Sequence, residues 1–571
     1  MQARRYAPFA AVVLAQLVVV ALAPSKPPQQ AGTSFASGAY APGAAGAPGA
    51  AAGGGTAGGV AGGAATGGTG AGGTTGGGAT GSGAVAGPSG AVSSGGGAPG
   101  STTAAGKGDT SHCRNGRQFA GILTAPPCVP TWTKGADNGG TTYKGVTAKT
   151  IKIVYFREKD NPVVKGLLQS QGLYSDPADQ QRFLQAAETF INSKYELYGR
   201  KVEFSFYRSP CQAAPPDPTC FRTDAKNLVA QEKPFGVFYD NNTNTPAFFD
   251  ELSKLGVVNF GGWHFQDSFS TQRRPFHYDV YMGGDFQATL TGEYWCKKLA
   301  GKKARYAGTP DLQAKVRKAV VFYPQTEVNT EPAQRLESIM RKCGSDVVDI
   351  PYSPDTATAA QQSRSQVQKA KDAGVTSVLY FADPIAPAFG TNQMTQQAWF
   401  PEQVLVGSGL IDYDKLARLY DQQQWKNAFG PSDLPMPDAL EKSDAAVVWK
   451  DAGQSGPPYA SSNLPWSYLA TMACGIQMSG PTLNPGTFEQ ALLSGTCNGG
   501  GWRDGQNPKR ARVQFGKGDY TALSDARQVW WDPNAPSKID GKNGAYVDMD
   551  GGRRYAIGDW TPGEPALPGR S

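Results

Sequence analysis

Short apolar runs alternate with longer amphipathic stretches from about residue 146 onward. A run such as TIKIVYF (150–156) is typical of a buried strand because it is brief, apolar and rich in β-branched and aromatic residues. Further strands are expected at 201–208, 234–239 and 256–262, with amphipathic helices at 180–194, 221–231 and 246–255. This alternation predicts a lobe in which helices cover a parallel sheet.

The same alternation repeats in the next part of the chain. Strands are expected at 277–282, 318–324, 345–352, 377–383 and 403–409, with helices near 285–300 and 331–342. Apolar helices at 466–476 and 487–493 follow, and then strands at 512–516, 528–531 and 545–550. The repeat predicts an α/β protein with two Rossmann-like lobes, to which the C-terminal strands return.

The N-terminal part of the chain has a different composition. Residues 31 to about 107 are almost entirely Gly, Ala, Ser and Thr, so they cannot bury enough apolar surface to offset the entropy of ordering. We therefore predict a disordered linker over 24–107. Ahead of it, two arginines precede an apolar run over 7–23, which is typical of an export signal. We expect an exported protein of the cell envelope or the extracellular space.

The fate of the export segment, residues 1–23, is open. An Ala-Leu-Ala sequence suits cleavage as a signal peptide, but Pro24 directly after it hinders that cleavage. The apolar run is just long enough to span a bilayer, so the segment is alternatively an uncleaved membrane anchor. Contact with a membrane is expected only through this segment.

The cysteines of the chain form an even set without a Cys-x-x-Cys pair. In an oxidising compartment they most simply form disulfides, and pairing of neighbours in the sequence is favoured, although the sequence does not determine the connectivity. The cysteines are Cys113, Cys128, Cys211, Cys220, Cys296, Cys343, Cys474 and Cys497. The first two belong to an N-terminal extension, residues 108–145.

Charge and motifs weigh against several functions. The formal charge of +7 is spread along the chain rather than gathered in a basic run with aromatics, so nucleic-acid binding is not expected. The three histidines show no metal-ligand spacing, and neither a metal nor a cofactor is predicted. The sequence GTCNG (495–499) has the form of a nucleophile elbow and suggests, as an alternative function, a hydrolase that uses Cys497. However, it follows a helix rather than a strand, so a disulfide is favoured and no enzyme is predicted.

Several segments carry a resemblance to a known family. They are GVTAKTIKIVYF, YGRKVEFSFY, DAKNLVAQEKPFGVF and KLGVVNFGG in the first lobe, and KAVVFYPQTEVNTEPAQRLESIMRKCGSDVV, AGVTSVLYFADP and PEQVLVGSG in the second. In this order, over roughly 146–530, the chain resembles the branched-chain amino acid (leucine-binding-like) substrate-binding proteins of ABC transporters. The resemblance implies a type I periplasmic binding fold, in which two lobes joined by a three-strand hinge close on a small ligand.

The resemblance also implies how the chain is divided between the lobes. Lobe I is expected to comprise 146–276 and 435–512, lobe II 277–434 and 513–560, and a tail 561–571.

The resemblance places ligand contacts in lobe I at two loops that follow strands. Asn241, Asn242 and Thr243 precede an expected helix start and offer donors to a carboxylate or hydroxyl, although polar residues at such a junction are also ordinary turn and cap chemistry. In the second loop, Trp263 and His264 stand where the family has a small or hydroxyl residue. They suit a flat or larger ligand, unless Trp263 merely packs between the lobes.

The second lobe departs from the family pattern of two aromatics and an acid after its strands. Ser408 and Gly409 stand at the position of the acid. Tyr323, Glu327 and Asp383 are the ligand-binding candidates here, and the ligand class stays open among amino acids, amides and aromatic acids. The long segment 157–179 predicts a cover over the cleft mouth or a surface loop.

The resulting functional prediction is an extracytoplasmic solute-binding protein that captures a small polar ligand between two lobes and delivers it to an ABC permease. The alternative is a membrane-tethered sensor or scaffold without a transport role. A hydrolase that uses Cys497 is the third interpretation.

Overall fold

The computed structural model describes residues 108–239, 245–381, 383–407, 410–495, 497, 515–516 and 518–568. The predicted export segment and linker lie outside these residues. No helix in the described part of the chain is long and apolar enough to cross a membrane.

A parallel sheet forms the centre of lobe I, with strand order β2-β1-β3-β4-β5. Alternate residues of β1 pack on opposite faces: Ile153 and Tyr155 join one hydrophobic cluster, and Val154 and Phe156 join another. This two-sided burial explains why the strand is apolar throughout. The strands are β1 (Thr150–Arg157), β2 (Lys201–Arg208), β3 (Gly236–Phe238), β4 (Val258–Phe260) and β5 (His277–Tyr278).

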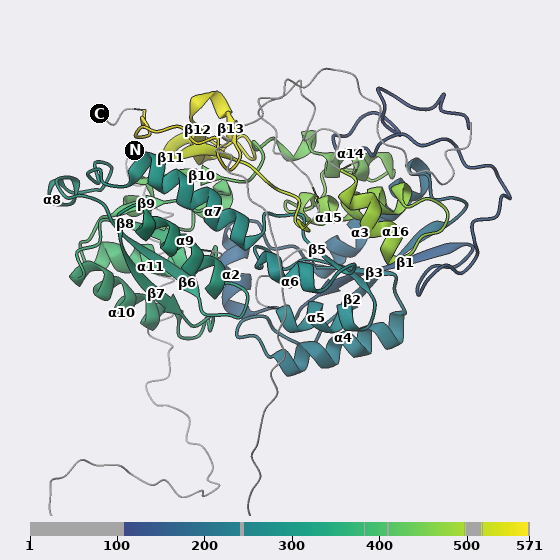
Figure 1. Ribbon diagram of the computed structural model, residues 1–571, viewed down its shortest axis with the longest axis horizontal. Coiled ribbons are helices and arrows are strands. Elements are labelled where there is room, and N and C mark those ends of the chain that lie inside the picture. The colour runs from purple at the N-terminus through teal and green to yellow at the C-terminus, as the bar shows by residue number, and fades with distance from the viewer. Residues whose placement is uncertain are drawn as a thin grey trace, which may run out of the picture. The chain divides into compact units, whose positions relative to one another are not determined.

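Helices cover both faces of the lobe I sheet (Figure 1). They are α3 (Pro177–Lys194), α4 (Pro218–Glu232), α5 (Pro246–Lys254) and α6 (Asp267–Gln272), whereas α2 (Pro162–Ser170) has no buried residue and packs on neither face. Phe183 of α3 packs in the same cluster as Ile153, whereas Phe221 of α4 and Phe248 of α5 pack with Phe156.

Strand β5 corrects the expected boundary between the lobes. We predicted that 277–282 opens lobe II, but His277 and Tyr278 pair in parallel with Asn259 and Phe260 of β4. The strand is only two residues long, so its apolar pattern carries no information about which sheet it joins. Its neighbours in space determine that, and the first crossing between the lobes comes after it.

Lobe II contains a larger sheet with strand order β12-β11-β10-β9-β8-β6-β7, in which β13 also pairs with β11. Its parallel part consists of β6 (Lys318–Pro324), β7 (Asp346–Tyr352), β8 (Ser377–Tyr380), β9 (Glu402–Val404) and β10 (Ala428–Ser432). The accompanying helices are α7 (Gly284–Tyr294), η2 (Trp295–Leu299), α8 (Pro310–Gln313), α9 (Thr330–Lys342), α10 (Ala359–Asp372), α11 (Ala386–Gln396), α12 (Asp414–Ala417) and α13 (Gln422–Trp425).

The C-terminal part of the chain contributes first to lobe I and then to lobe II. After η3 (Leu440–Lys442), the helices α14 (Asp444–Asp451), α15 (Asn463–Met478) and α16 (Pro485–Leu493) pack on lobe I, where Trp449 stacks on Phe183 and Phe488 meets Phe235. The chain then returns to lobe II as β11 (Ala526–Pro536), β12 (Asn543–Asp548), η4 (Asp550–Gly552) and β13 (Arg554–Tyr555). These strands pair antiparallel, so the lobe II sheet is mixed rather than purely parallel.

Two C-terminal segments differ from a regular strand and a free tail. The expected strand 512–516 lies mostly outside the described residues, and Gly516 forms only an isolated bridge with Asp519. The expected tail is not free in its described part, because Leu567 is buried and Tyr306 donates its hydroxyl hydrogen to the Pro565 carbonyl. This segment therefore packs against lobe II.

Four disulfides join the cysteines in sequence order. They are Cys113–Cys128, Cys211–Cys220, Cys296–Cys343 and Cys474–Cys497. Because Cys497 is bonded to Cys474, it has no thiolate to act as a nucleophile, and the structure gives the hydrolase interpretation no support.

Three crossings connect the lobes, after β5, after β10 and before β11. The first and third lie side by side: Asp279 and Thr521 form a parallel bridge, and the Gly283 amide donates to Thr521 Oγ1 at 3.1 Å. Arg554 joins the second crossing to the third, because its guanidinium donates to the Leu434 carbonyl at 2.9 Å and to Asp525 Oδ1 at 2.8 Å. The described residues thus show the expected three-strand hinge.

The first crossing carries a carboxyl group that predicts a pH effect on stability. Asp279 is 3% exposed, and burial raises its pKa to about 7. Since the folded state holds this proton more tightly than the unfolded state, the free energy of unfolding falls as pH rises from about 4 to about 7. We expect Asp279→Asn to flatten this dependence and to stabilise the protein at pH 8 by about 2 kcal/mol. This value is half of the free energy that the whole pKa shift corresponds to, at about 1.4 kcal/mol per pKa unit.

Urea unfolding of the wild type and Asp279→Asn at pH 4, 6 and 8 measures this effect. The asparagine oxygen still accepts from the Tyr281 amide and the Tyr468 hydroxyl, as Asp279 Oδ1 does, so local structure is preserved. Parallel pH profiles for the two proteins would refute the assignment.

Candidate functional site

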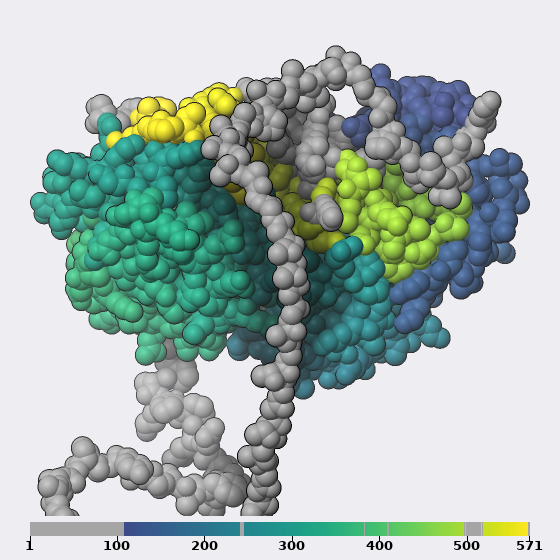
Figure 2. All heavy atoms as spheres, viewed as in Figure 1, coloured from purple at the N-terminus to yellow at the C-terminus, as the bar shows by residue number. Residues whose placement is uncertain are grey.

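A cleft of about 550 Å³ is lined by residues of both lobes. Figure 2 shows the surface hollowed between lobe II, in teal and green, and lobe I, in blue and lime. Several lining residues lie at or beyond the carboxyl ends of strands: Arg157 is the last residue of β1, Trp263 follows β4, Asp383 follows β8 and Asp412 follows β9. Ligands of parallel α/β proteins bind at this edge of the sheet.

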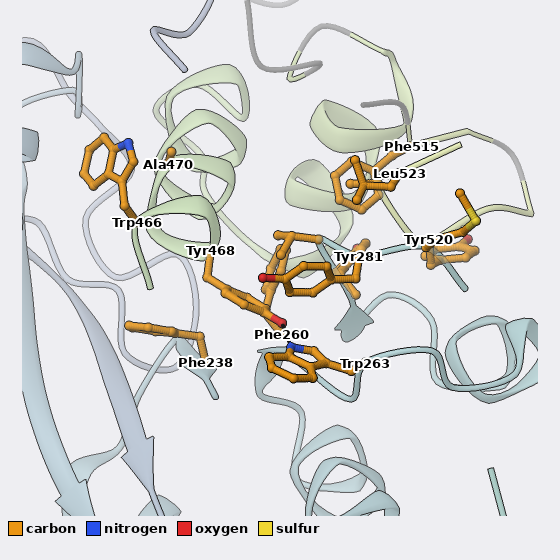
Figure 3. Close-up of a cluster of buried hydrophobic side chains, with 14 of the residues drawn as sticks. Phe238, Phe260, Trp263, Tyr281, Trp466, Tyr468, Ala470, Phe515, Tyr520 and Leu523 are labelled. Carbon is orange, nitrogen blue, oxygen red and sulfur yellow. Dashed lines mark hydrogen bonds between the residues drawn. The ribbon is translucent and has the colours of Figure 1, made fainter. Parts of the chain in front are cut away.

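Trp263 belongs to an aromatic wall of the cleft. Its ring lies 5.3 Å from that of Tyr281, and its Nε1 donates to the Tyr468 hydroxyl at 3.0 Å (Figure 3). The Tyr468 hydroxyl in turn donates to Asp279 of the first crossing at 3.1 Å. Trp263 is 5% exposed and lines the cleft, and its hydrogen bond to Tyr468 ties this wall to the hinge.

His264, the other residue predicted in this loop, lies away from the cleft lining. It is buried, it does not line the cleft, and its Nδ1 lies 2.8 Å from the Met282 carbonyl of the first crossing. Burial lowers its pKa to about 4, so the imidazole is neutral at physiological pH. The geometry gives His264 a place in the hinge rather than at a ligand.

The other loop predicted to bind the ligand in lobe I, with Asn241, Asn242 and Thr243, lies outside the described residues. The helix after it begins as expected, with Pro246 at its first position. Thr245 is at the N-cap position, but its side chain makes no capping bond and its buried Oγ1 has no partner among the described residues.

Tyr323 and Glu327 of lobe II do not line the cleft. Successive side chains of β6 point to opposite faces of the sheet, which sends Phe322 toward the cleft and Tyr323 into the core shared with α9. Glu327 is exposed elsewhere on the surface. The sequence does not show which way these two side chains point, because the direction of a strand residue and of the loop after it depends on the sheet rather than on the local sequence.

Asp383 does line the cleft, but its oxygens are already engaged. Oδ1 accepts from the amide of Ile385 at 2.7 Å, and Oδ2 accepts from the Tyr352 hydroxyl at 2.8 Å. Burial raises the pKa of this carboxyl. Asp383 therefore holds the backbone before α11 and the Tyr352 side chain in place.

Asp412 is the functional candidate that the sequence analysis missed. It lines the cleft and is 2% exposed, yet neither carboxyl oxygen has a hydrogen-bond partner among the described residues. Burial raises its pKa, while Ser432 and Arg527 favour the ionised form. The family pattern calls for an acid just after 403–409, and Asp412 follows this segment by three residues, so a slightly wider search would have found it.

The segment 157–179 contains the predicted cover. It folds as α2, a helix with no buried residue of its own, and Val164, Lys165 and Leu168 of this helix line the cleft. At its base, Arg157 donates to Asp160 at 2.7 Å.

Asn161 fastens the cover at both sides. Its Oδ1 accepts from the Val163 amide at 3.0 Å and caps α2, while its Nδ2 donates to the Ala214 carbonyl at 2.6 Å. Nδ2 also lies 3.1 Å from Thr356 Oγ1, and this bond crosses from lobe I to lobe II. The Cys211–Cys220 loop supports the same segment, since the Lys159 amide donates to the Cys211 carbonyl at 2.8 Å.

This arrangement predicts that Asn161→Ala weakens ligand binding. The variant loses the helix cap, worth about 1 kcal/mol, and the bond across the cleft mouth, so we expect about 3- to 10-fold weaker binding, mainly through faster dissociation. Stopped-flow fluorescence of ligand release measures this. Thr356→Val is the matched control, because it removes only the bond between the lobes. Wild-type release rates in both variants would show that the Asn161–Thr356 contact does not retain the ligand.

The comparisons with known proteins agree with this architecture. No family model matches the chain, and no curated protein matches it. Among solved structures, it is similar to a solute-binding protein of an ABC transporter from R. palustris in complex with 4-hydroxybenzoate, with 13% identity, coverage of 72% of this chain and 99% of that chain, and a TM-score of 0.50.

Two further structures show the same likeness. A leucine-binding protein from Thermotoga maritima MSB8 has 12% identity, covers 72% of this chain and 100% of its own, and gives a TM-score of 0.50. An ABC transporter substrate-binding protein from Aeropyrum pernix has 11% identity, covers 72% and 96% respectively, and also gives 0.50. With the two sheets, the three crossings and the cleft between the lobes, these likenesses define the type I periplasmic binding fold.

Proposed function

We propose that this protein is an exported solute-binding protein that captures a small ligand by closure of its two lobes and delivers it to an ABC permease. The observation that carries the proposal is the cleft between the lobes with a buried, unpartnered carboxyl group, Asp412, in its wall. A ligand that contacts both walls favours the closed form through its differential affinity, which is how such proteins signal occupancy.

The wall chemistry narrows the ligand class. Asp412 favours a cationic or strongly donating group, because its buried carboxyl oxygens make no hydrogen bond among the described residues. The aromatic wall around Trp263 suits an apolar or flat portion. Asn241, Asn242 and Thr243 remain the predicted donors to a carboxylate or hydroxyl. Together they favour an amino acid or a related amine over a neutral sugar.

The similar solved structures support capture of a solute of this size. One of them is bound to 4-hydroxybenzoate, and another is a leucine-binding protein. Both kinds of solute are small and combine an apolar portion with a charged group. A cleft of about 550 Å³ accommodates such ligands.

The test is a thermal-shift screen of the full chain against amino acids, amines, amides, aromatic acids and sugars. We expect one chemical class to raise the melting temperature, and small-angle scattering to show a smaller radius of gyration with that ligand. Asn242→Ala should reduce the shift. A chain that none of the solutes stabilises or compacts would not be a solute-binding protein of this kind.

A further inference from the structure

The N-terminal extension reaches the ligand cleft. Leu123, Thr124, Pro126 and Pro127 all belong to the cleft lining, although they precede the first strand of the α/β fold. The sheets of both lobes are complete without this segment. Its presence in the wall therefore calls for a separate explanation.

Hydrogen bonds fix the backbone of the extension at this point. The amides of Leu123 and Thr124 donate to the Asp444 carboxylate at 2.9 and 2.8 Å, and Thr124 Oγ1 donates to it at 2.7 Å. Trp466 Nε1 donates to the same Oγ1 at 3.0 Å. Asp444 begins α14 and Trp466 lies on α15, so the extension is anchored to two helices of lobe I.

The extension is also closed on itself. The Cys113–Cys128 disulfide spans the segment that carries the lining residues, and the Gln118 amide donates to the Pro126 carbonyl at 3.0 Å. Gln477 of α15 donates to the Pro127 carbonyl at 2.8 Å. A wall held this way is already in place before a ligand arrives, which lowers the entropic cost of binding.

Leu123 is the residue of this wall that remains available. Its backbone is fixed, yet its side chain is 44% exposed, which makes it one of the few large apolar side chains at the surface of the described chain. A leucine placed so on a cleft wall gains stabilisation when an apolar group covers it.

We propose that the extension is a third wall of the ligand cleft and selects an amphiphilic solute, whose amino group pairs with Asp412 and whose apolar chain covers Leu123 and the two prolines. This inference rests on the proposed function and specifies its ligand. Asp412 belongs to lobe II and the extension is tied to lobe I, so such a solute contacts both lobes.

The experiment uses straight-chain 2-amino acids, from alanine to 2-aminodecanoic acid, titrated into the full chain by calorimetry. For the wild type we expect affinity to rise with chain length, by up to about 4-fold for each methylene that reaches the wall. Leu123→Ser should weaken binding of the long members by about 3- to 9-fold and leave the short members unchanged. This range is the effect of burying a whole leucine side chain, scaled by the fraction of Leu123 that is exposed.

Val316→Ser is the matched control, because Val316 is a 58% exposed apolar residue that does not line the cleft. It should bind the whole series as the wild type does. Equal weakening by both variants, or a Leu123→Ser profile identical to the wild type, would overturn the third wall while leaving solute binding intact. A series that does not bind at all would overturn the ligand class, and the broader screen then judges the function separately.

Discussion

Replacing Arg317 with methionine is expected to destabilise the protein by about 3 to 5 kcal/mol, because it leaves a buried carboxylate without its partner. The Arg317 and Glu402 side chains have no exposed surface. The guanidinium donates to both oxygens of Glu402 at 2.8 Å, and its remaining nitrogen donates to Glu564 at 2.7 Å. One side chain therefore joins β9 to the C-terminal segment that packs on lobe II.

Chemical denaturation monitored by circular dichroism measures this loss. The matched control is Arg305→Met, since Arg305 contacts the same Glu564 at 3.5 Å but is 44% exposed, and exposed ion pairs contribute about 0 to 1 kcal/mol. The double variant with Glu402→Gln should recover part of the stability, because no uncompensated charge remains. A single variant as stable as the Arg305→Met protein would show that the buried pair is not important for stability.

Substitution of Asp412 by asparagine is expected to change stability and ligand affinity in opposite directions. Removal of a buried, unpartnered carboxyl group should stabilise the protein without ligand, whereas loss of the charge should cost an amine ligand at least about 2 kcal/mol, or about 30-fold in affinity. Because burial raises the pKa of Asp412, wild-type affinity for an amine should also fall as the pH is lowered and the carboxyl group takes up a proton.

Calorimetric titration with the ligand found by the screen, at pH 5 and pH 8, tests both effects. Asp383→Asn serves as the control, because both Asp383 oxygens already have partners and its loss should lower stability. If Asp412→Asn binds the ligand as tightly as the wild type, with the same pH dependence, the amine pairs elsewhere in the cleft.

Some of the features behind these predictions can be recognised in the sequence, and others only in the folded structure. The paired strands and helices of 150–260 and 318–404 follow from local patterns, since a strand buried on both faces must be apolar throughout and an amphipathic helix must repeat every three to four residues. A cover over the cleft was one of the two predictions for segment 157–179, and in the structure this segment contains helix α2, which lines the cleft.

Other features can be recognised only in the folded structure. The sheet to which β5 belongs depends on which strand lies beside it, and the facing of Tyr323 depends on the register of β6 against its neighbours. Asp412 is an ordinary loop residue in the sequence. Only its burial without a partner distinguishes it, and burial is a property of everything packed around it.

The sequence by itself determined the two-lobed α/β class and the approximate position of nearly every long element, because periodicity and apolar runs are local consequences of burial. The tertiary structure alone decided which side chains face the cleft, how the N-terminal extension and the C-terminal segment are attached, and which carboxyl groups lack partners. Those properties arise from contacts between residues hundreds of positions apart, such as Thr124 with Asp444 and Arg317 with Glu564.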